Sequence, residues 1–150
     1  MLHSEQNPSQ LRQSLAILQA ALDSTADAIL VIDAAGRVAA FNPQFKRIWG
    51  MADTSLNVGD SAESLRYIFG QLKQADEFLR RVDAIYRESK LRHYQELEFK
   101  DGRIIESYYQ PQIADGETVA RVWSFRDITE QKNARRRLAQ LSFGMDQMQD

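Results

Sequence analysis

The residues from Trp123 to Lys132, which read Trp-Ser-Phe-Arg-Asp-Ile-Thr-Glu-Gln-Lys, constrain the fold of this chain more than any other segment. Residues 119–126 alternate with a period of two and are of types that favour strands, so a strand is predicted there. Asp127 and Glu130 then form a D-x-x-E variant of the capping box, which predicts a helix from about Ile128. Because no flexible spacer separates the two elements, a shift of the strand passes directly to the helix.

Both ends of the chain carry the apolar spacing of a coiled-coil helix. In the exit helix and again near the N-terminus, apolar residues recur four and three positions apart and form one narrow seam. The two seams consist of Ala134, Leu138, Leu141, Met145 and Met148, and of Leu11, Leu15, Leu18 and Leu22. We therefore predict a polar, disordered tail over residues 1–10, an amphipathic dimerisation helix over 11–23 and a linker helix over 132–150.

The two ends also match each other at an offset of 123 residues. Arg12, Leu15, Ala16, Leu18, Asp23 and Asp27 recur as Arg135, Leu138, Ala139, Leu141, Asp146 and Asp150. Such a match in a short, leucine-rich stretch also arises by chance. The alternative interpretation is that residues 132–150 are the leader helix of a second copy of the domain, so that the chain is one unit of an array.

Composition limits the class of protein. A length of 150 residues with 43% hydrophobic content suits one domain with flanking helices, and not two domains. A net charge of −2 gives no argument for binding nucleic acid or an anionic membrane. The absence of cysteine excludes disulfides, thiolate metal sites and thiol catalysis, and fits a reducing cytoplasm. No apolar run approaches the roughly 20 residues of a spanning helix, so we expect no membrane contact from this chain.

The central segment, 24–131, alternates between strand and helix patterns in a segregated order. Two short apolar runs around Gly36 predict a hairpin, and Asn42 with Pro43 predicts the capped start of a short helix. Asp60 with Glu63 predicts the cap of another helix, and a longer amphipathic helix follows from about Ala75 to Ser89. Three strands then come in succession over 94–100, 103–110 and 119–126. This order predicts an α+β domain whose antiparallel sheet is covered by helices on one face.

The sequence pattern of the strand at 103–110 does not decide by itself which side of the strand faces inward. One side carries Ile105, Ser107 and Tyr109, and the other carries Ile104, Glu106 and Tyr108. We favour the first set inward, because burying Glu106 without a partner is costly.

With these motifs in order, the chain resembles a PAS domain, a sensory module of bacterial signalling proteins. The resemblance covers roughly residues 24–131 and rests on four motifs. These are Asp33 with Gly36, Asn42-Pro43, Asp101-Gly102 and Arg126-Asp127-Ile128-Thr129. It implies five strands in the order 2-1-5-4-3, with short helices and one long helix on one face, and a leading helix that dimerises.

The resemblance also implies a function. Such a domain holds a small ligand between its sheet and long helix, and passes strain through the Asp127, Ile128 and Thr129 turn into the linker. The implied parent is a multidomain protein with a downstream module in the same chain. A sensor histidine kinase is favoured and a diguanylate cyclase or phosphodiesterase comes next.

Eight residues are candidates for the ligand pocket: Leu97, Phe99, Ile105, Ser107, Tyr109, Arg121, Trp123 and Phe125. The alternative for most of them is that they only fill the core. Polar tips on an inward face need partners, which singles out Ser107, Tyr109 and Arg121. Arg121 either receives a ligand carboxylate in a bidentate fork, or pairs with Glu117 or reaches the sheet edge.

No cofactor and no catalytic activity are indicated. The predicted long helix lacks the histidine that family members often use for haem, and a lone His93 near a helix end is more often solvated or capping. Photochemical flavin needs a cysteine, whereas non-covalent flavin stays open. The sequence has no phosphate-binding glycine loop, no metal-binding motif and no kinase phosphoacceptor histidine. We expect a sensor domain that is not itself an enzyme. A ligand-free dimerisation and spacer module and, further behind, a small stand-alone enzyme are the alternatives.

Overall fold

The alternating segments form a five-stranded antiparallel sheet in the computed structural model, which describes residues 7–88 and 90–148. The strand order is β2-β1-β5-β4-β3, which confirms the order implied by the resemblance. At the last hairpin, Asp115 and Gly116 both have positive φ angles of 52° and 78°, as a two-residue turn of this kind requires. The strands are β1 Ala28–Asp33, β2 Val38–Phe41, β3 His93–Glu98, β4 Ile104–Ala114 and β5 Glu117–Asp127.

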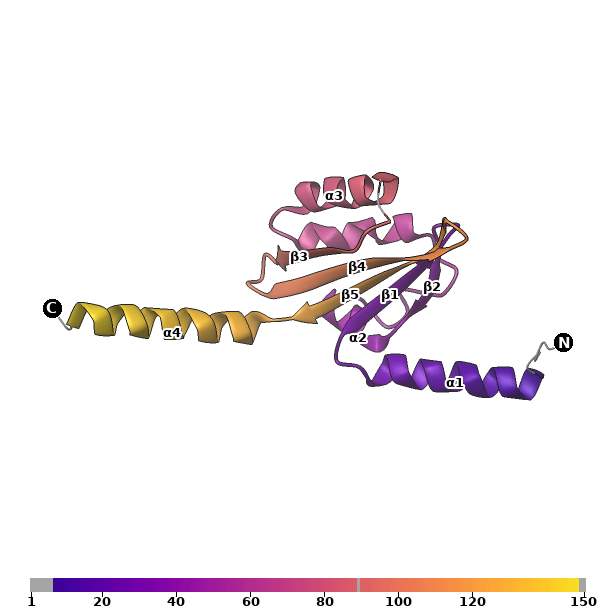
Figure 1. Ribbon diagram of the computed structural model, residues 1–150, viewed down its shortest axis with the longest axis horizontal. Helices are drawn as coiled ribbons and strands as arrows, with labels where there is room; N and C mark the ends of the chain where they lie inside the picture. The colour runs from indigo at the N-terminus through magenta and orange to yellow at the C-terminus, as the bar shows by residue number, and fades with distance from the viewer. Residues whose placement is uncertain (1–6, 89, 149–150) are drawn as a thin grey trace.

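Three helical segments pack on one face of this sheet (Figure 1). They are α2 Pro43–Ile48, the 3₁₀ helix η1 Ala62–Gln71 and α3 Ala75–Glu88. The predicted cap of η1 was wrong by one residue, because Ser61 Oγ accepts a hydrogen bond from the Glu63 backbone N–H. The Asp60 carboxylate instead accepts from the Asn57 N–H and closes the preceding loop.

A helix leaves the domain at each end, α1 Pro8–Ser24 and α4 Thr129–Met148. Figure 1 shows that they extend away from the sheet. The prediction of a disordered tail to residue 10 was wrong for residues 8–10, because Asn7 and Gln10 form a reciprocal capping box that starts α1 at Pro8. Residues 1–6 of that predicted tail lie outside the described residues. In the part of the chain that the structure describes, no helix combines the length and the apolar character that crossing a bilayer requires.

Asn42 joins α1, β1 and α2 at one buried point. Its side chain is fully buried, and its Oδ1 accepts from the backbone N–H of Ile29 at 2.9 Å and of Phe45 at 3.3 Å. Its Nδ2 donates to the carbonyl oxygens of Leu22 at 2.9 Å and Asp27 at 2.8 Å. The predicted N-cap of α2 is thus confirmed. The same amide also fixes the end of α1 against the start of the sheet.

Aromatic rings fill the space between the sheet and its helices. Trp49 of α2's C-terminal cap packs against Phe69, Phe99 and Phe125, with ring centres 4.9 to 5.3 Å apart. Trp123 lies with its ring centre 4.8 Å from that of Tyr109. Phe69, Trp123 and Phe125 of this cluster also line the candidate site.

Candidate functional site

A cavity of about 200 Å³ lies inside the domain, between the central strands and the helices that cover them. Its floor is formed by β1 and β5, and its walls come from α2, η1 and α3. The apolar lining consists of Leu30, Ile32, Phe45, Ala62, Leu65, Phe69, Phe78, Leu79, Val82, Trp123 and Phe125, with Tyr86 beside them. A largely apolar space of this size can hold one ring-sized molecule.

The cavity includes only two of the eight predicted pocket residues, Trp123 and Phe125. Leu97, Phe99, Ile105, Ser107 and Tyr109 are all buried, which agrees with the predicted inward side, but they pack in the core outside this lining. Their role as ligand contacts stays a prediction. The sequence missed the contributions of β1 and η1, because its patterns mark buried faces without showing where packing leaves space.

Tyr86 of α3 provides a polar group at the cavity wall. The indole Nε1 of Trp123 donates a hydrogen bond to the Tyr86 hydroxyl oxygen at 2.8 Å and so connects α3 to β5. Burial raises the pKa of Tyr86 above its ordinary value, so the phenol is neutral at physiological pH. Tyr86 belongs to the amphipathic helix predicted from about Ala75 to Ser89.

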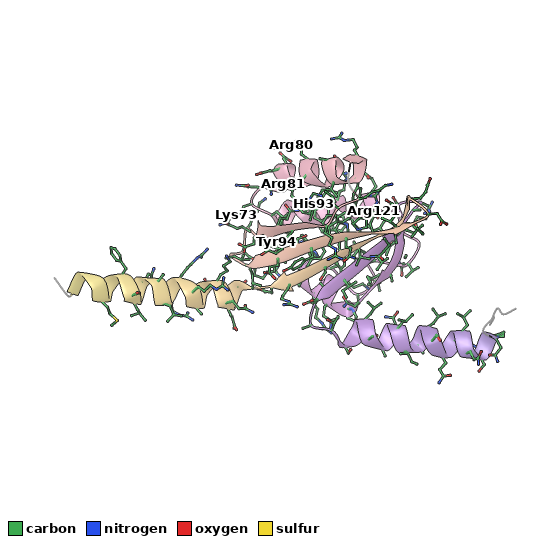
Figure 2. The ribbon with its side chains drawn as sticks, in the orientation of Figure 1. Lys73, Arg80, Arg81, His93, Tyr94 and Arg121 are labelled. Carbon is green, nitrogen blue, oxygen red and sulfur yellow. The ribbon has the colours of Figure 1, made fainter. Side chains whose placement is uncertain are left out.

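Arg121 contacts two tyrosines. Its Nη1 donates to the Tyr109 hydroxyl at 3.1 Å, and its guanidinium carbon lies 4.2 Å from the centre of the Tyr86 ring. Figure 2 shows Arg121 on the long β4–β5 hairpin. Among the described residues Arg121 makes no ion pair with Glu117 and does not line the cavity. The guanidinium therefore contacts both tyrosines from outside the cavity lining, as a cation over the ring of Tyr86 and as a hydrogen-bond donor to Tyr109.

Charged side chains of η1 and α3 form the rim of the cavity. Arg66 of η1 pairs with Asp83 of α3 at 2.5 Å and with Glu63 at 3.1 Å, and all three residues contact the cavity. The hydrogen bond that Arg66 donates to the Asp83 carboxylate is the main reason that the pKa of Arg66 is raised. This rim lies between η1 and α3 and carries two carboxylates and one guanidinium.

The predicted signal-transmission residues form the joint between β5 and α4. The Asp127 carboxylate accepts from the Thr129 backbone N–H at 2.9 Å, which caps the first turn of α4. The Ile128 N–H donates to the Ile104 carbonyl at 2.9 Å, and the Ile104 N–H donates to Thr129 Oγ1 at 3.0 Å. Ile128 is buried. The joint is therefore attached to the start of β4 and has no free linker.

The outer face of the sheet carries a row of charged residues that ends at α4. Glu96, Glu106 and Arg126 stand opposite one another on β3, β4 and β5. Arg126 forms a bidentate pair with Asp27 at 2.8 and 3.0 Å, and Lys132 of α4 pairs with Glu96 at 3.0 Å. We call these five residues the outer charged row. It links the segment after α1 to the first turns of α4.

Tyr94 lies beside Glu96 and Glu106, two of the three carboxylates of the outer charged row. Its hydroxyl is 3.0 Å from Glu106 Oε1 and 3.3 Å from Glu96 Oε2, so it can donate to either. Desolvation and these neighbouring carboxylates raise the pKa of Tyr94 above its ordinary value. Without such a donor, two carboxylates on paired positions would repel each other.

Two predicted polar residues have different surroundings. Ser107 is buried, and its hydroxyl has no hydrogen-bond partner among the described residues, so the expected partner is not found. His93 begins β3 with its ring centre 6.2 Å from that of Tyr109, and it lies outside the lining of the cavity.

Comparison with known proteins agrees with this architecture. The PAS domain of Bordetella pertussis BvgS is 18% identical, with a TM-score of 0.61 over 88% of this chain and 98% of that chain. The PAS domain of an HTR-like protein from Haloarcula marismortui is 21% identical, with a TM-score of 0.54 over 80% and 96%. A sensory box histidine kinase/response regulator from Burkholderia thailandensis is 19% identical, with a TM-score of 0.54 over 87% and 98%.

The likeness to these structures concerns the fold. No curated protein gives a significant match. The family model of the PAS fold, however, matches residues 22–136, which include the whole sheet, the cavity and the joint to α4. The chain therefore belongs to the PAS family of sensory domains.

Proposed function

We propose that this PAS domain senses a small molecule in its inner cavity and signals through α4. The observation that carries the proposal is that β5 lines the cavity with Trp123 and Phe125 and continues, after one residue, into α4. A ligand that displaces either ring displaces the strand that holds the exit helix. Packed interfaces switch between alternative arrangements more readily than they deform, so a small shift can change how α4 pairs.

The proposed signal route passes through Asp127, Ile128 and Thr129. Two hydrogen bonds connect this joint to Ile104 on β4, one between backbone groups and one from the Ile104 backbone N–H to the Thr129 side chain. Strands β4 and β5 therefore hold the start of α4 together. The ion pair of Lys132 with Glu96 adds β3 to the same unit. Three strands therefore bear on the first turns of α4.

We further propose that the domain works as a homodimer. Leu11, Leu15 and Leu18 are 49 to 61% exposed on α1, and Leu22 is half-buried. No residue of α1 is buried. In Figure 2 most of the length of α1 and α4 extends beyond the sheet and its covering helices. Pairing of two α1 seams would bury these leucines, as in a coiled coil.

The proposed parent is a cytoplasmic signalling protein with an output module beyond α4. Structural neighbours include domains of histidine kinases, which favours a kinase, and a cyclic-dinucleotide enzyme comes next. The isolated chain acts as a sensor and not as an enzyme. Its net charge of −2 gives no support for nucleic acid or an anionic membrane as a partner.

A second proposal is that the domain is a ligand-free spacer. Dense aromatic packing around Trp49, with three ring neighbours, favours a core that serves stability alone. In that case dimerisation and the geometry of α1 and α4 would be the whole function.

Native mass spectrometry of the purified chain distinguishes the two proposals. Sensing predicts a retained small molecule, or binding of ring-sized probes with millimolar or lower Kd. The spacer proposal predicts the bare mass and no binding by any probe. Sedimentation equilibrium tests the dimer separately. A wild-type chain that stays a strict monomer at high concentration would contradict pairing through α1. The double variant Leu15→Glu with Leu18→Glu, in contrast, is expected to be a monomer because it places charges in the α1 seam.

A further inference from the structure

We propose that the cavity selects a compact, neutral, ring-containing ligand with one hydrogen-bond acceptor, and that the Tyr86 hydroxyl donates to that acceptor. The inference rests on the proposed function, because it assigns a chemical class to the ligand of the same cavity. It follows from the size of the space, the chemistry of its walls, the hydrogen bonding of Tyr86 and the charges at the rim.

Size and wall chemistry limit the ligand to one ring with a small substituent. An apolar cavity of roughly 150 Å³ holds benzene, and this cavity has about 200 Å³. Six of its lining residues are aromatic: Phe45, Phe69, Phe78, Tyr86, Trp123 and Phe125. Rings of this kind pack against a flat ligand edge-on or offset, at low entropic cost.

Tyr86 has a hydrogen to donate inside this wall. Its oxygen accepts from Trp123 Nε1, and among the described residues no acceptor takes the hydroxyl hydrogen. The guanidinium of Arg121, 4.2 Å from the ring centre, draws electron density from the phenol and makes its O–H a better donor. Burial keeps the phenol protonated, because it raises the pKa of Tyr86. A ligand carbonyl or ring nitrogen can therefore accept from it.

The charges at the rim disfavour an anionic ligand. Glu63 and Asp83 bring two negative charges, and the single guanidinium of Arg66 is already paired with both. Arg121, the cation that the sequence suggested for a carboxylate, bonds to Tyr109 and lies outside the lining. An ionised group in the apolar interior would lose its hydration without gaining a free partner.

Three probes of nearly equal shape test the inference: acetophenone, α-methylstyrene and benzoate. The first has a neutral acceptor, the second replaces the carbonyl oxygen by a methylene, and the third is an anion. Titration followed by the indole N–H resonance of Trp123 gives a Kd for each. We expect benzoate to bind at least tenfold more weakly than acetophenone.

The variant Tyr86→Phe removes the donor and keeps the ring. It should weaken acetophenone about five- to tenfold relative to α-methylstyrene, as expected for one neutral hydrogen bond. Tyr109→Phe is the matched control, because its hydroxyl lies outside the cavity lining, and the ratio should stay as in the wild type. If Tyr86→Phe does not fold, the carbonyl stretch of acetophenone bound to the wild type reports the hydrogen bond, by its shift to lower frequency.

The outcomes separate the inference from the proposed function. Binding of the neutral probes with no change of ratio in Tyr86→Phe, or with an unshifted carbonyl stretch, overturns the inference and leaves ligand sensing standing. Tightest binding by benzoate overturns the preference for neutral ligands. Failure of all three probes to bind contradicts both the inference and the proposal that this cavity is a sensor site.

Discussion

The two faces of the central sheet differ in the interactions that their side chains make. The inner face is apolar and aromatic and encloses a cavity of about 200 Å³ beneath α3. The outer face carries the outer charged row, from Asp27 across three strands to Lys132. Desolvation and packing contribute most of the stability of the inner face. The outer face is held by partly exposed ion pairs, each worth about 1 kcal/mol or less. Stability therefore depends on the inner face, and the position of α4 depends on both.

Strand β5 is where the two faces meet. Successive residues of a strand point to opposite sides, so Phe125 lines the cavity while Arg126 pairs with Asp27 on the outer face. Under the proposed function, a movement of β5 that starts at the cavity would also change the outer ion pairs. The same strand would then connect a buried event to an exposed helix without a flexible linker.

The largest expected effect is on the inner face. Trp123→Ala should lower the free energy of unfolding by about 3–5 kcal/mol, because it removes a buried aromatic side chain and leaves a larger cavity. Urea denaturation measures the loss. The control is Ser124→Ala, the next residue on the opposite face, which should change stability by about 0.5 kcal/mol or less. Equal losses in both variants would contradict the difference between the faces.

A smaller loss is expected where a polar side chain is buried with all its partners. Asn42→Ala removes hydrogen bonds to Ile29, Phe45, Leu22 and Asp27, and should cost about 2–3 kcal/mol. Thermal unfolding of this variant should be compared with that of Asn7→Ala. Asn7 caps α1 in the same way on an exposed helix, so about 1 kcal/mol or less is expected there. A ranking in the reverse order would refute the role given to Asn42.

On the outer face, the coupling between Lys132 and Glu96 should be weaker still. A double-mutant cycle with Lys132→Met and Glu96→Gln is expected to give about 0.5–1 kcal/mol, since both side chains are partly exposed. The coupling should shrink in 1 M salt, because screening acts on exposed pairs. A coupling that salt leaves unchanged would mean that the pair is effectively buried.

The smallest effect appears at alkaline pH. Burial raises the pKa of Tyr86 and of Tyr109 above that of tyrosine in the unfolded chain, which is about 10. The folded state then binds protons more strongly, so this contribution to stability is complete below pH 10 and is lost as pH rises through the raised pKa values. Urea titrations at several pH values from 8 upward should show this decline. The double variant Tyr86→Phe with Tyr109→Phe should show a shallower one.

Local sequence motifs were enough to predict most of the fold, but they predicted less of the candidate site. Asn42-Pro43 and Asp101-Gly102 specify their cap and turn by themselves, so the segment order and the PAS resemblance led to the correct sheet. The cavity depends on the distance at which η1 and α3 pack over β1, and the hydrophobic periodicity of the sequence does not encode this distance. Arg121 illustrates the limit: the pattern marked it as an inward cation, but only tertiary packing places it on Tyr86 and Tyr109.

Amide hydrogen exchange with and without saturating acetophenone tests most directly whether the cavity and α4 are coupled through β5. We predict altered protection at the joint, residues 127–132, together with the cavity strands. The N-terminal half of α1 serves as the internal reference and should not change. A change confined to the cavity walls, with unaltered exchange at the joint, would contradict the account.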